Sequence, residues 1–484
     1  MKIAFLQETV NQNVGVMYLA ALLKAAGHSV ELFIEPLEPD FLTAVKQFRP
    51  EVVGFSVITG AHHWVIRMAR QLKQDLPTVT TVAGGAHPTY FPDMVWEKPI
   101  DIIARGEAEL SFPELISRLG RGEDFRRTPG LWVKDNQEVY KNEVAPLVED
   151  ISALPHPDHE LYLKYPFYRQ QTEVPFSTTR GCPFRCSFCY NHVKAALYKG
   201  KGRYVRTRAV ADVIGEMAAA RLMYPNMRSV VLYDDIIGLD KKWLAEFCGA
   251  YAQSINLPWF TSIRADFVDE EVAAHLARAN CFCLSLGVES GDEDLREKVL
   301  CKRIPDAVYL QAAAVLHRAG IKVRTSNMLF LPDEDVQKAL KTIDLNRAMA
   351  VDYAWAYTLQ PYPGTDIFAY AVKQGYLSSA FQFDDIDPLG LVKPIVELKD
   401  RNKLLVIHRF FYYAVKNTLM RQMLRFLLLF PPNPLYDLCY YFSLVLSYAQ
   451  YHQVSLARAL RVAWNNYWST RKPKIATQGL KSTG

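Results

Sequence analysis

The sequence predicts an α/β protein in which a Rossmann-like domain precedes a partial (βα)6 barrel of the TIM type and a helical carboxy-terminal region. Short β-rich segments alternate with helical patterns over residues 1–120 and again from about residue 172, and the strand pattern is lost after residue 385. Such alternation produces parallel sheets covered by helices, whose ligands bind beyond the carboxyl ends of the strands.

The first domain, residues 1–127, is expected to contain five strands with helices between them. The strands are predicted at 2–7, 29–35, 51–57, 78–84 and 101–107, and the helices at 17–27, 41–48, 64–74 and 111–119. A linker at 128–171 follows, with a small hairpin at 130–143 and a Pro-rich stretch at 153–162.

The barrel domain, residues 172–385, is expected to contain six strand–helix units. The strands are predicted at 176–180, 229–235, 259–266, 282–290, 322–332 and 353–363, and the helices at 209–224, 241–253, 270–280, 305–320 and 336–350. Six units in this length predict an open barrel with its site at the carboxyl ends of the strands.

The carboxy-terminal region, residues 386–484, has a different charge from the rest. Twelve Lys or Arg against one acid, Asp437, give residues 401–484 a charge of +11, which leaves −6 for residues 1–400 of the total of +5. Arg409, Lys416, Arg421 and Arg425 interleave with aromatic and Leu-rich helices. This pattern fits a peripheral membrane contact or a mouth for an apolar substrate; the alternative is a cap packed on the barrel with a solvated basic rim.

Composition excludes several classes of protein. With 50% apolar and 22% charged residues, the chain is neither disordered nor collagen-like. No stretch of about 20 residues is apolar and uncharged, so no membrane-spanning helix is expected. Eight Cys without a recognisable export signal predict reduced thiols in the cytoplasm. The apolar density of the carboxy-terminal helices argues against a nucleic-acid partner.

The most specific motif is the C-x-x-x-C-x-x-C segment of Cys182, Cys186 and Cys189, which directly follows the first barrel strand. Three thiolates can bind one face of a metal centre and leave a coordination position open. A structural zinc site or a closed cluster takes four ligands. The alternatives are a zinc loop or incidental cysteines. The other five Cys form no C-x-x-C pair.

This motif in this position resembles the radical S-adenosylmethionine (SAM) superfamily, over about residues 172–370. The resemblance implies that the three cysteines bind a 4Fe–4S cluster whose open iron binds SAM, and that an external low-potential electron donor drives SAM cleavage to a 5′-deoxyadenosyl radical. It implies SAM contacts at Phe188, Asp234, Asp235, Arg264, Glu289, Ser290 and Asn327. For the charged members of this set, the alternative is a salt bridge at a strand end. The family's Gly-rich segment after the fifth strand is absent.

Three motifs of the first domain lie at predicted strand ends: S-V-I-T-G at 56–60, A-G-G-A-H-P-T at 83–89 and R-G-E-A-E at 105–109. Gly84 and Gly85 allow a ligand to approach the backbone closely, and Ser56 and Thr59 offer hydroxyls to the same edge. Because G-x-G-x-x-G is absent, nicotinamide or flavin binding has no support.

This arrangement resembles a cobalamin-binding domain fused ahead of a radical SAM barrel, over about residues 1–120. The resemblance implies cobalamin contacts at Ser56, Thr59, Gly60, Gly84, Gly85, His87, Thr89, Arg105, Gly106 and Glu107. The cobalt-ligating His of many such domains is missing, because the loop at 7–15 contains no His. Either the cobalt has no protein His below it or the domain has lost cobalamin. We expect His87 to contact the cofactor tail rather than cobalt.

The resemblance implies a cobalamin-dependent radical SAM methyltransferase that places a methyl group on an unactivated carbon of an apolar or polycyclic small molecule. Its chemistry would use the 5′-deoxyadenosyl radical and methylcobalamin, as in hopanoid methylases. One alternative is a radical SAM oxidative cyclase of the magnesium-protoporphyrin monomethyl ester type, and another is a non-catalytic Fe–S or cobalamin-binding protein. The expected location is the cytoplasm, peripheral to the membrane.

Overall fold

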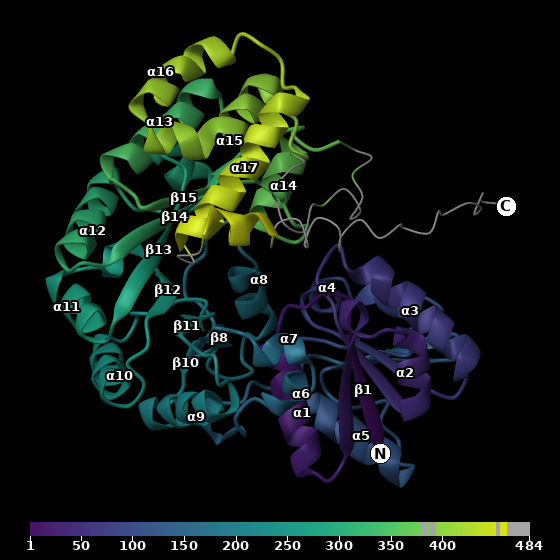
Figure 1. Ribbon diagram of the computed structural model, residues 1–484. Helices are drawn as coiled ribbons and strands as arrows, with labels where there is room; N and C mark the ends of the chain where they lie inside the picture. Colours follow the sequence, from purple (N-terminus) through teal and green to yellow (C-terminus); the bar gives the residue numbers. More distant parts are fainter. Residues whose placement is uncertain (379–380, 382–385, 387–393, 452–454, 462–484) are drawn as a thin grey trace.

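The computed structural model describes residues 1–378, 381, 386, 394–451 and 455–461. Two separate parallel sheets form the centres of the two halves of the chain, and three helices near the carboxyl end lie beside the second sheet (Figure 1). The predicted fold class is therefore confirmed.

The first sheet has seven strands in the order β2-β1-β3-β4-β5-β6-β7. They are β1 Lys2–Gln7, β2 Ser29–Ile34, β3 Val52–Ser56, β4 Thr80–Gly84, β5 Ile102–Ala104, β6 Leu131–Asp135 and β7 Glu138–Lys141. The first five are parallel, and β6 and β7 add antiparallel to the edge at β5. The hairpin expected in the linker thus extends this sheet, while the limits of the functional domains stay predictions.

Helices cover both faces of the first sheet. They are α1 Val14–Ala25, α2 Phe41–Phe48, α3 His62–Asp75, α4 Ala86–Tyr90 and α5 Ser111–Arg121, with 3-10 turns at Glu35–Leu37 and Pro92–Trp96. Ile3 and Phe5 pack in one buried cluster with Phe112 of α5, and Ala4 packs in another with Trp64 of α3. This alternation explains why β1 is apolar at nearly every position: both of its faces are buried.

The second sheet has six parallel strands in the order β15-β14-β13-β12-β11-β8. They are β8 Glu173–Phe176, β11 Ser229–Leu232, β12 Trp259–Ile263, β13 Cys281–Glu289, β14 Lys322–Leu329 and β15 Tyr353–Thr358. The helices are α9 Val210–Met223, α10 Lys241–Ser254, α11 Glu270–Arg278, α12 Asp306–Arg318, α13 Val336–Ala348 and α14 Asp366–Lys373. Since β8 and β15 do not pair, this is the open partial barrel that the sequence predicts.

Shorter elements connect the two sheets and surround the cysteine motif. They are η3 Ile151–Ala153, α6 Glu160–Leu163, α7 Pro166–Arg169, β9 Thr179–Arg180, α8 Tyr190–Leu197, β10 Arg206–Thr207, η4 Ala265–Phe267 and the π-helical turn Leu295–Val299. The sequence reasoning did not anticipate α8, whose first residue directly follows the last cysteine of the motif.

Three carboxy-terminal helices pack beside β15: α15 Arg401–Lys416, α16 Thr418–Leu427 and α17 Pro434–Tyr451 (Figure 1). Three of the interleaved basic residues bind neighbouring elements. Arg409 pairs with Asp437 at 2.7 Å, Arg421 pairs with Asp344 at 2.7 Å, and the Lys416 ammonium donates to backbone carbonyls. The region is thus a cap on the barrel, as in the predicted alternative.

No helix in the described part of the chain is long and apolar enough to cross a bilayer. The basic residues Arg471, Lys472, Lys474 and Lys481 lie outside the described residues, as does the predicted boundary at residue 385.

Candidate active site

The three cysteines of the motif lie on the loop that follows β8 and β9, and all three are partly buried free thiols. Cys189 caps the amino end of α8, where its sulfur accepts a hydrogen bond from the Asn191 backbone N–H at 3.4 Å. Among the described residues, no three His, Cys, Asp or Glu side chains are placed to hold a single metal ion. In a cluster, by contrast, each thiolate would bind a different iron.

Burial raises the pKa of all three thiols, that of Cys186 to about 11. The charges of Lys302 and Arg264 act in the opposite direction on Cys186, and that of Arg264 does so on Cys182. Such thiols are protonated at neutral pH until a metal binds and removes the proton. The donor set of three thiols with two cations nearby therefore fits an iron–sulfur cluster, because the cations offset the negative charge of the bound thiolates.

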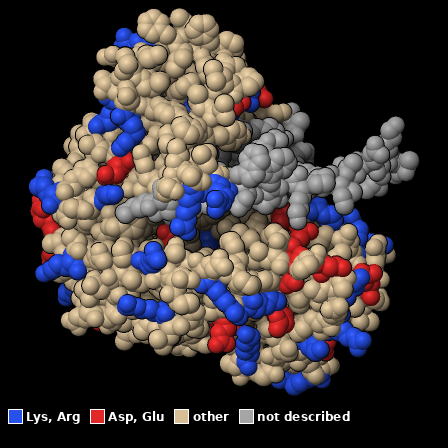
Figure 2. Space-filling model, viewed as in Figure 1, with Lys and Arg blue, Asp and Glu red and all other residues tan. Residues whose placement is uncertain are grey.

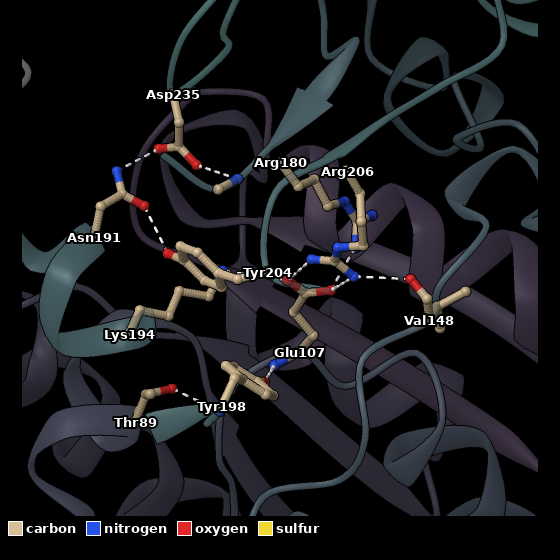
Figure 3. A network of polar contacts seen from close by, with 12 residues as sticks. Thr89, Glu107, Val148, Arg180, Asn191, Lys194, Tyr198, Tyr204, Arg206 and Asp235 are labelled. Carbon is tan, nitrogen blue, oxygen red and sulfur yellow. Dashed lines mark hydrogen bonds and ion pairs between the residues drawn. The ribbon is translucent and has the colours of Figure 1, made fainter. Parts of the chain in front are cut away.

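Asp235 holds the cysteine loop in place. Its carboxylate accepts hydrogen bonds from the Gly181 backbone N–H and from the Asn191 side chain, both at 2.9 Å (Figure 3). The Tyr204 hydroxyl donates in turn to Oδ1 of the Asn191 side chain at 2.7 Å. Gly181 has a φ of +83°, and a Cβ there would lie 2.4 Å from the Tyr204 carbonyl oxygen. Only glycine fits this turn into the motif.

Asp234, also expected at the SAM site, binds the segment that precedes the cysteines. It accepts hydrogen bonds from the backbone N–H groups of Thr178 and Thr179 at 2.6 and 2.9 Å and from the Thr178 hydroxyl at 2.5 Å. Burial raises its pKa to about 6 despite these bonds. The two neighbouring aspartates thus shape the loop, and their contact with SAM stays a prediction.

Arg264 and Glu289 form the salt bridges that were the alternative interpretation. Arg264 pairs with Asp266 at 2.8 Å and lies 3.5 Å from the centroid of the Phe184 ring, within the cysteine loop. Glu289 has a φ of +67° and pairs at 3.1 Å with Lys302. Lys302, which sequence reasoning missed, is buried and acts on the Cys186 thiol. A single Lys in an irregular segment carries no sequence signal that could have found it.

Phe188, Ser290 and Asn327 face packed protein. Phe188 packs against the barrel core, and the buried Ser290 hydroxyl accepts from the Asp292 backbone N–H at 3.2 Å. Asn327 is buried, donates to the Trp355 carbonyl at 2.9 Å and accepts from Asn346 of α13 at 2.8 Å. Its side chain points to the helix layer, away from the barrel interior, so the structure gives its predicted SAM contact no support.

The inner face of the barrel holds a partly open cavity of about 370 Å³. Its lining includes Asp234, Ser262, Ser285, Arg324, Ser326 and Trp355 from the strands, and Tyr448 and Tyr451 from α17. Alternation along β14 places Arg324 and Ser326 inside and Asn327 outside. The prediction of Asn327 as a SAM contact did not take this alternation of side chains into account.

The first two motifs of the amino-terminal domain meet at the carboxyl edge of its sheet. The Thr59 hydroxyl lies 3.1 Å from Nδ1 of His87, whose ring stacks on His62 with centroids 4.4 Å apart. Burial and the neighbouring imidazoles lower the pKa of His87 to about 3, so this ring is neutral at physiological pH. Ser56 accepts from Asn13 at 2.7 Å, and Gly60 donates its N–H to His62 at 3.2 Å.

Two glycines allow the segments of this edge to lie close together. Gly85, which follows Gly84 at the end of β4, has a φ of +93°, and a Cβ there would lie 2.9 Å from the Val57 nitrogen. The Thr89 hydroxyl accepts from the Gly106 N–H at 2.9 Å, and the Arg105 guanidinium donates to the Thr89 carbonyl at 3.3 Å. The predicted cobalamin-contact segments therefore form one surface.

Glu107, the last predicted cobalamin contact, joins the two halves of the molecule. Its carboxylate pairs with Arg206 at 2.6 Å, Arg180 at 3.0 Å and Lys194 at 3.4 Å (Figure 3). Although burial alone would raise its pKa, the hydrogen bond from Arg206 and the charges of Lys194 and Arg180 hold it at about 2. Arg180 directly precedes Gly181, so the network ends at the cysteine loop.

A ring contact reinforces this junction. Tyr90, at the end of α4, stacks on Tyr190 with centroids 4.0 Å apart and an interplanar angle of 9°. Tyr190 directly follows Cys189. The carboxyl edge of the first sheet therefore lies against the cysteine loop.

Two family models match the chain. The B12 binding domain matches residues 8–116, and the radical SAM superfamily matches residues 176–345. These matches define a radical SAM enzyme with an amino-terminal B12-binding domain. The chain thus belongs to the cobalamin-dependent radical SAM enzymes, and its cofactor classes are cobalamin, SAM and the iron–sulfur cluster of that superfamily.

Relatives of known sequence include both predicted reaction types. A protein described as an uncharacterized methyltransferase from Pyrococcus horikoshii is 28% identical, over 80% of this chain and 84% of its own. The anaerobic magnesium-protoporphyrin IX monomethyl ester cyclase of Rubrivivax gelatinosus is 26% identical, over 81% of this chain and 71% of the cyclase. The hopanoid C-3 methylase of Methylococcus capsulatus is 25% identical, over 73% of this chain and 67% of the methylase. The methyltransferase type of enzyme is favoured, and the predicted family resemblance is confirmed.

Among solved structures, the radical SAM methyltransferase TsrM from Kitasatospora setae, with cobalamin and a [4Fe-4S] cluster bound, superposes with a TM-score of 0.64. The match has 18% sequence identity and covers 78% of this chain and 79% of TsrM. At this identity, the likeness supports the shared fold alone.

Proposed function

We propose that the protein methylates an unactivated carbon of an apolar or polycyclic small molecule. The observation that carries this proposal is the junction at Glu107, which holds the candidate cobalamin surface against the cysteine loop. A methyl donor and a hydrogen-abstracting group must reach one substrate carbon, and proximity of the two sites meets that requirement.

Cys182, Cys186 and Cys189 would hold the 4Fe–4S cluster. When bound, the cofactors supply a 5′-deoxyadenosyl radical and a methyl group. The chain's residues orient this chemistry. Asp235 and Asn191 fix the loop.

The remaining predicted contacts are kept as part of this proposal. Residues proposed at the SAM site are Phe188, Asp234, Asp235, Arg264, Glu289 and Ser290. Those proposed around cobalamin are the strand-end residues Ser56, Thr59, Gly60, Gly84, Gly85, His87, Thr89, Arg105, Gly106 and Glu107. Because Thr59 and His62 already contact the neutral His87 ring, a contact of His87 with the cofactor tail fits better than a bond to cobalt.

An isotope experiment separates methylation from the cyclase alternative. Reduced, reconstituted enzyme would be incubated in ¹⁸O water with SAM carrying a deuterated methyl group, and with a hopanoid or a porphyrin ester as substrate. Formation of 5′-deoxyadenosine with a deuterated methyl in the product supports methyl transfer. Incorporation of ¹⁸O without the deuterated methyl identifies a cyclase. Absence of SAM cleavage identifies the non-catalytic alternative, which the enzyme names of these relatives disfavour.

A peripheral membrane contact in the cytoplasm is supported by apolar side chains exposed on α16, on α17 and between them. They include Leu419, Phe426, Leu429, Phe430, Leu435 and Leu438. Figure 2 shows the top of the molecule, where α16 lies, as largely uncharged. Exposed apolar patches of this kind on helices suit the headgroup boundary of a bilayer.

Liposome pelleting tests this contact. The double variant Leu429→Ser/Phe430→Ser should pellet less with phosphatidylglycerol vesicles than the unchanged chain. Leu222→Ser removes an apolar side chain that is 88% exposed on α9 and serves as the control. Equal pelleting of the double variant and the unchanged chain would contradict the membrane contact. The external low-potential electron donor, which the radical chemistry requires, is proposed without a docking site.

A further inference from the structure

Arg324 is a partly buried cation without a counter-ion among the described residues. It is the third residue of β14, near the amino end of the strand, and lines the barrel cavity. Within the described chain its side chain forms neither a salt bridge nor a hydrogen bond, and its Nε atom is enclosed. The deeply buried arginines Arg206, Arg208 and Arg296, in contrast, each pair with a carboxylate. Because burying an unpaired charge is costly, Arg324 calls for an explanation.

Aromatic rings hold the Arg324 guanidinium in place. Its central carbon lies 4.9 Å from the Trp355 ring centroid, 5.2 Å from that of Phe260 and 5.6 Å from that of Tyr451. Cation–π contacts of this kind orient a guanidinium while leaving its N–H groups available. Tyr451 comes from α17, so the carboxy-terminal cap completes this part of the cavity.

Further hydrogen-bond donors face the same cavity. Strand register aligns Ser262 with Ser285, and Ser285 with Arg324, so the three lie side by side on adjacent strands. The hydroxyls of Ser262, Ser285 and Ser326 make no hydrogen bond within the described residues. The indole N–H of Trp355 is enclosed without a partner. Buried donors are normally satisfied, so the enclosed Nε of Arg324 and the enclosed indole N–H of Trp355 indicate a ligand that accepts hydrogen bonds, and the serine hydroxyls, of which Ser262 is exposed, add donors beside them.

Two carboxyl groups also line the cavity without neutralising Arg324. Asp234 is bound by Thr178 and Thr179, as described above. Glu173 lies beyond ion-pair distance, and burial raises its pKa even though Arg324 acts in the opposite direction. Asp234 also marks the end of the cavity nearest the cysteine loop, whereas Arg324 lies closer to the amino ends of the strands.

We propose that this cavity binds a carboxylate or phosphate group of the substrate, with Arg324 as its counter-ion and the serine hydroxyls as donors. The inference rests on the proposed function and names the substrate class: an amphiphile with one anionic end. That end enters the barrel, and the apolar remainder extends toward the cysteine loop. Arg324 is then a specificity-determining residue, since removing the anion leaves its charge buried and unpaired.

Binding of simple amphiphiles tests the site without requiring activity. The probes are decanoate, decyl phosphate and decanol, titrated calorimetrically into the anaerobically purified full chain. We expect one or both anions to bind at least about tenfold more tightly than decanol, as one buried charge-assisted contact implies. Preference for decanoate identifies a carboxylic acid substrate, and preference for decyl phosphate identifies a phosphate ester.

Variants assign the effect to the cation. Arg324→Gln should lose at least about tenfold in anion affinity with decanol unchanged, and Arg324→Lys should retain part of it. Arg303→Gln, whose side chain is 82% exposed, is the matched control and should bind as the unchanged chain does. Equal binding of decanoate and decanol, or unchanged binding by Arg324→Gln, would overturn the proposal.

SAM itself carries a carboxylate, so its binding is measured as well. If Arg324→Gln weakens SAM binding as much as decanoate binding, the anion is that of SAM and the substrate assignment fails. Anion binding that persists in a protein unable to transfer methyl groups would refute the proposed function and leave this site intact.

Discussion

The junction at Glu107 and the cavity at Arg324 both hold arginines that are at least partly buried, but the two regions satisfy them differently. At the junction, Glu107 meets Arg180, Arg206 and Lys194, and its pKa is held far below the ordinary value. In the cavity, Arg324 contacts rings and has no carboxylate at ion-pair distance among the described residues. Charged groups that are paired within the protein stabilise one fixed arrangement. A charged group without a partner in the protein can still bind a ligand.

The largest expected effect lies between these two regions, at the cysteine loop that both adjoin. Cys182→Ala, Cys186→Ala and Cys189→Ala should each reduce SAM cleavage by the reconstituted, reduced enzyme to background, because a cluster that lacks a thiolate is lost or misplaced. Formation of 5′-deoxyadenosine is the measurement. Cys439→Ala, on α17, should cleave SAM at the unchanged rate, and cleavage by any of the three variants would refute its ligand role.

Breaking the junction should destabilise the fold. Glu107→Gln leaves Arg206 and Lys194 without a carboxylate partner among the described residues, whereas Arg180 keeps Glu109 at 2.6 Å, and the expected loss in the free energy of unfolding is about 3 kcal/mol. Denaturant unfolding measures it. Glu143→Gln removes the partner of Lys201, but the Glu143 side chain is 84% exposed, so its loss should be much smaller than that of Glu107→Gln. Equal losses of unfolding free energy in the two variants would show that the ion pairs of Glu107 contribute no more than an exposed surface pair.

The junction should also give stability a pH dependence. The folded pKa of Glu107 is about 2 against an ordinary 4.5. A depressed folded pKa stabilises the fold fully above the unfolded value and loses this contribution as pH falls toward the folded value. The difference in unfolding free energy between the unchanged chain and Glu107→Gln should therefore shrink between pH 4.5 and 2. A constant difference over this range would contradict the ionised state assigned to Glu107.

Asn327 tests which face of β14 serves the cavity. Asn327→Ala removes hydrogen bonds to Asn346 and to the Trp355 carbonyl, and the expected cost is about 1–3 kcal/mol of unfolding free energy. SAM affinity should not change, since the side chain points to the helix layer. A loss of SAM affinity without a loss of stability would restore Asn327 to the SAM site.

The smallest expected change in stability is that of Arg324→Gln, in contrast to the loss expected for Glu107→Gln at the junction. Arg324→Gln removes a charge that has no described partner, so the free energy of unfolding should stay within about 1 kcal/mol of the unchanged value or rise slightly. Thermal unfolding measured beside the decanoate titration checks this point. A destabilisation as large as that of Glu107→Gln would mean that Arg324 is a structural cation.

Much of the fold and part of the site could be predicted from sequence, because the signals are local. The period of apolar residues predicted the parallel strands of the two sheets, except that the first barrel strand was expected at 176–180 and β8 spans Glu173–Phe176. The cysteine spacing and the glycine-containing segments indicated the candidate cluster loop and the candidate cobalamin surface. The prediction for Asn327 failed to use the same period, since neighbours on a strand face opposite sides.

Long-range packing determined the rest. Glu107 binds Arg180 and Arg206, which are 73 and 99 residues away, and no local pattern links them. Tyr451 reaches the Arg324 cavity from α17, in a region whose composition indicated only an apolar, basic surface. The sequence by itself therefore determined the alternation of the main strands and helices, their order along the chain and the cluster motif. Only the tertiary structure decided which charges are neutralised and which one is left for a ligand, because charge pairing depends on distances between elements.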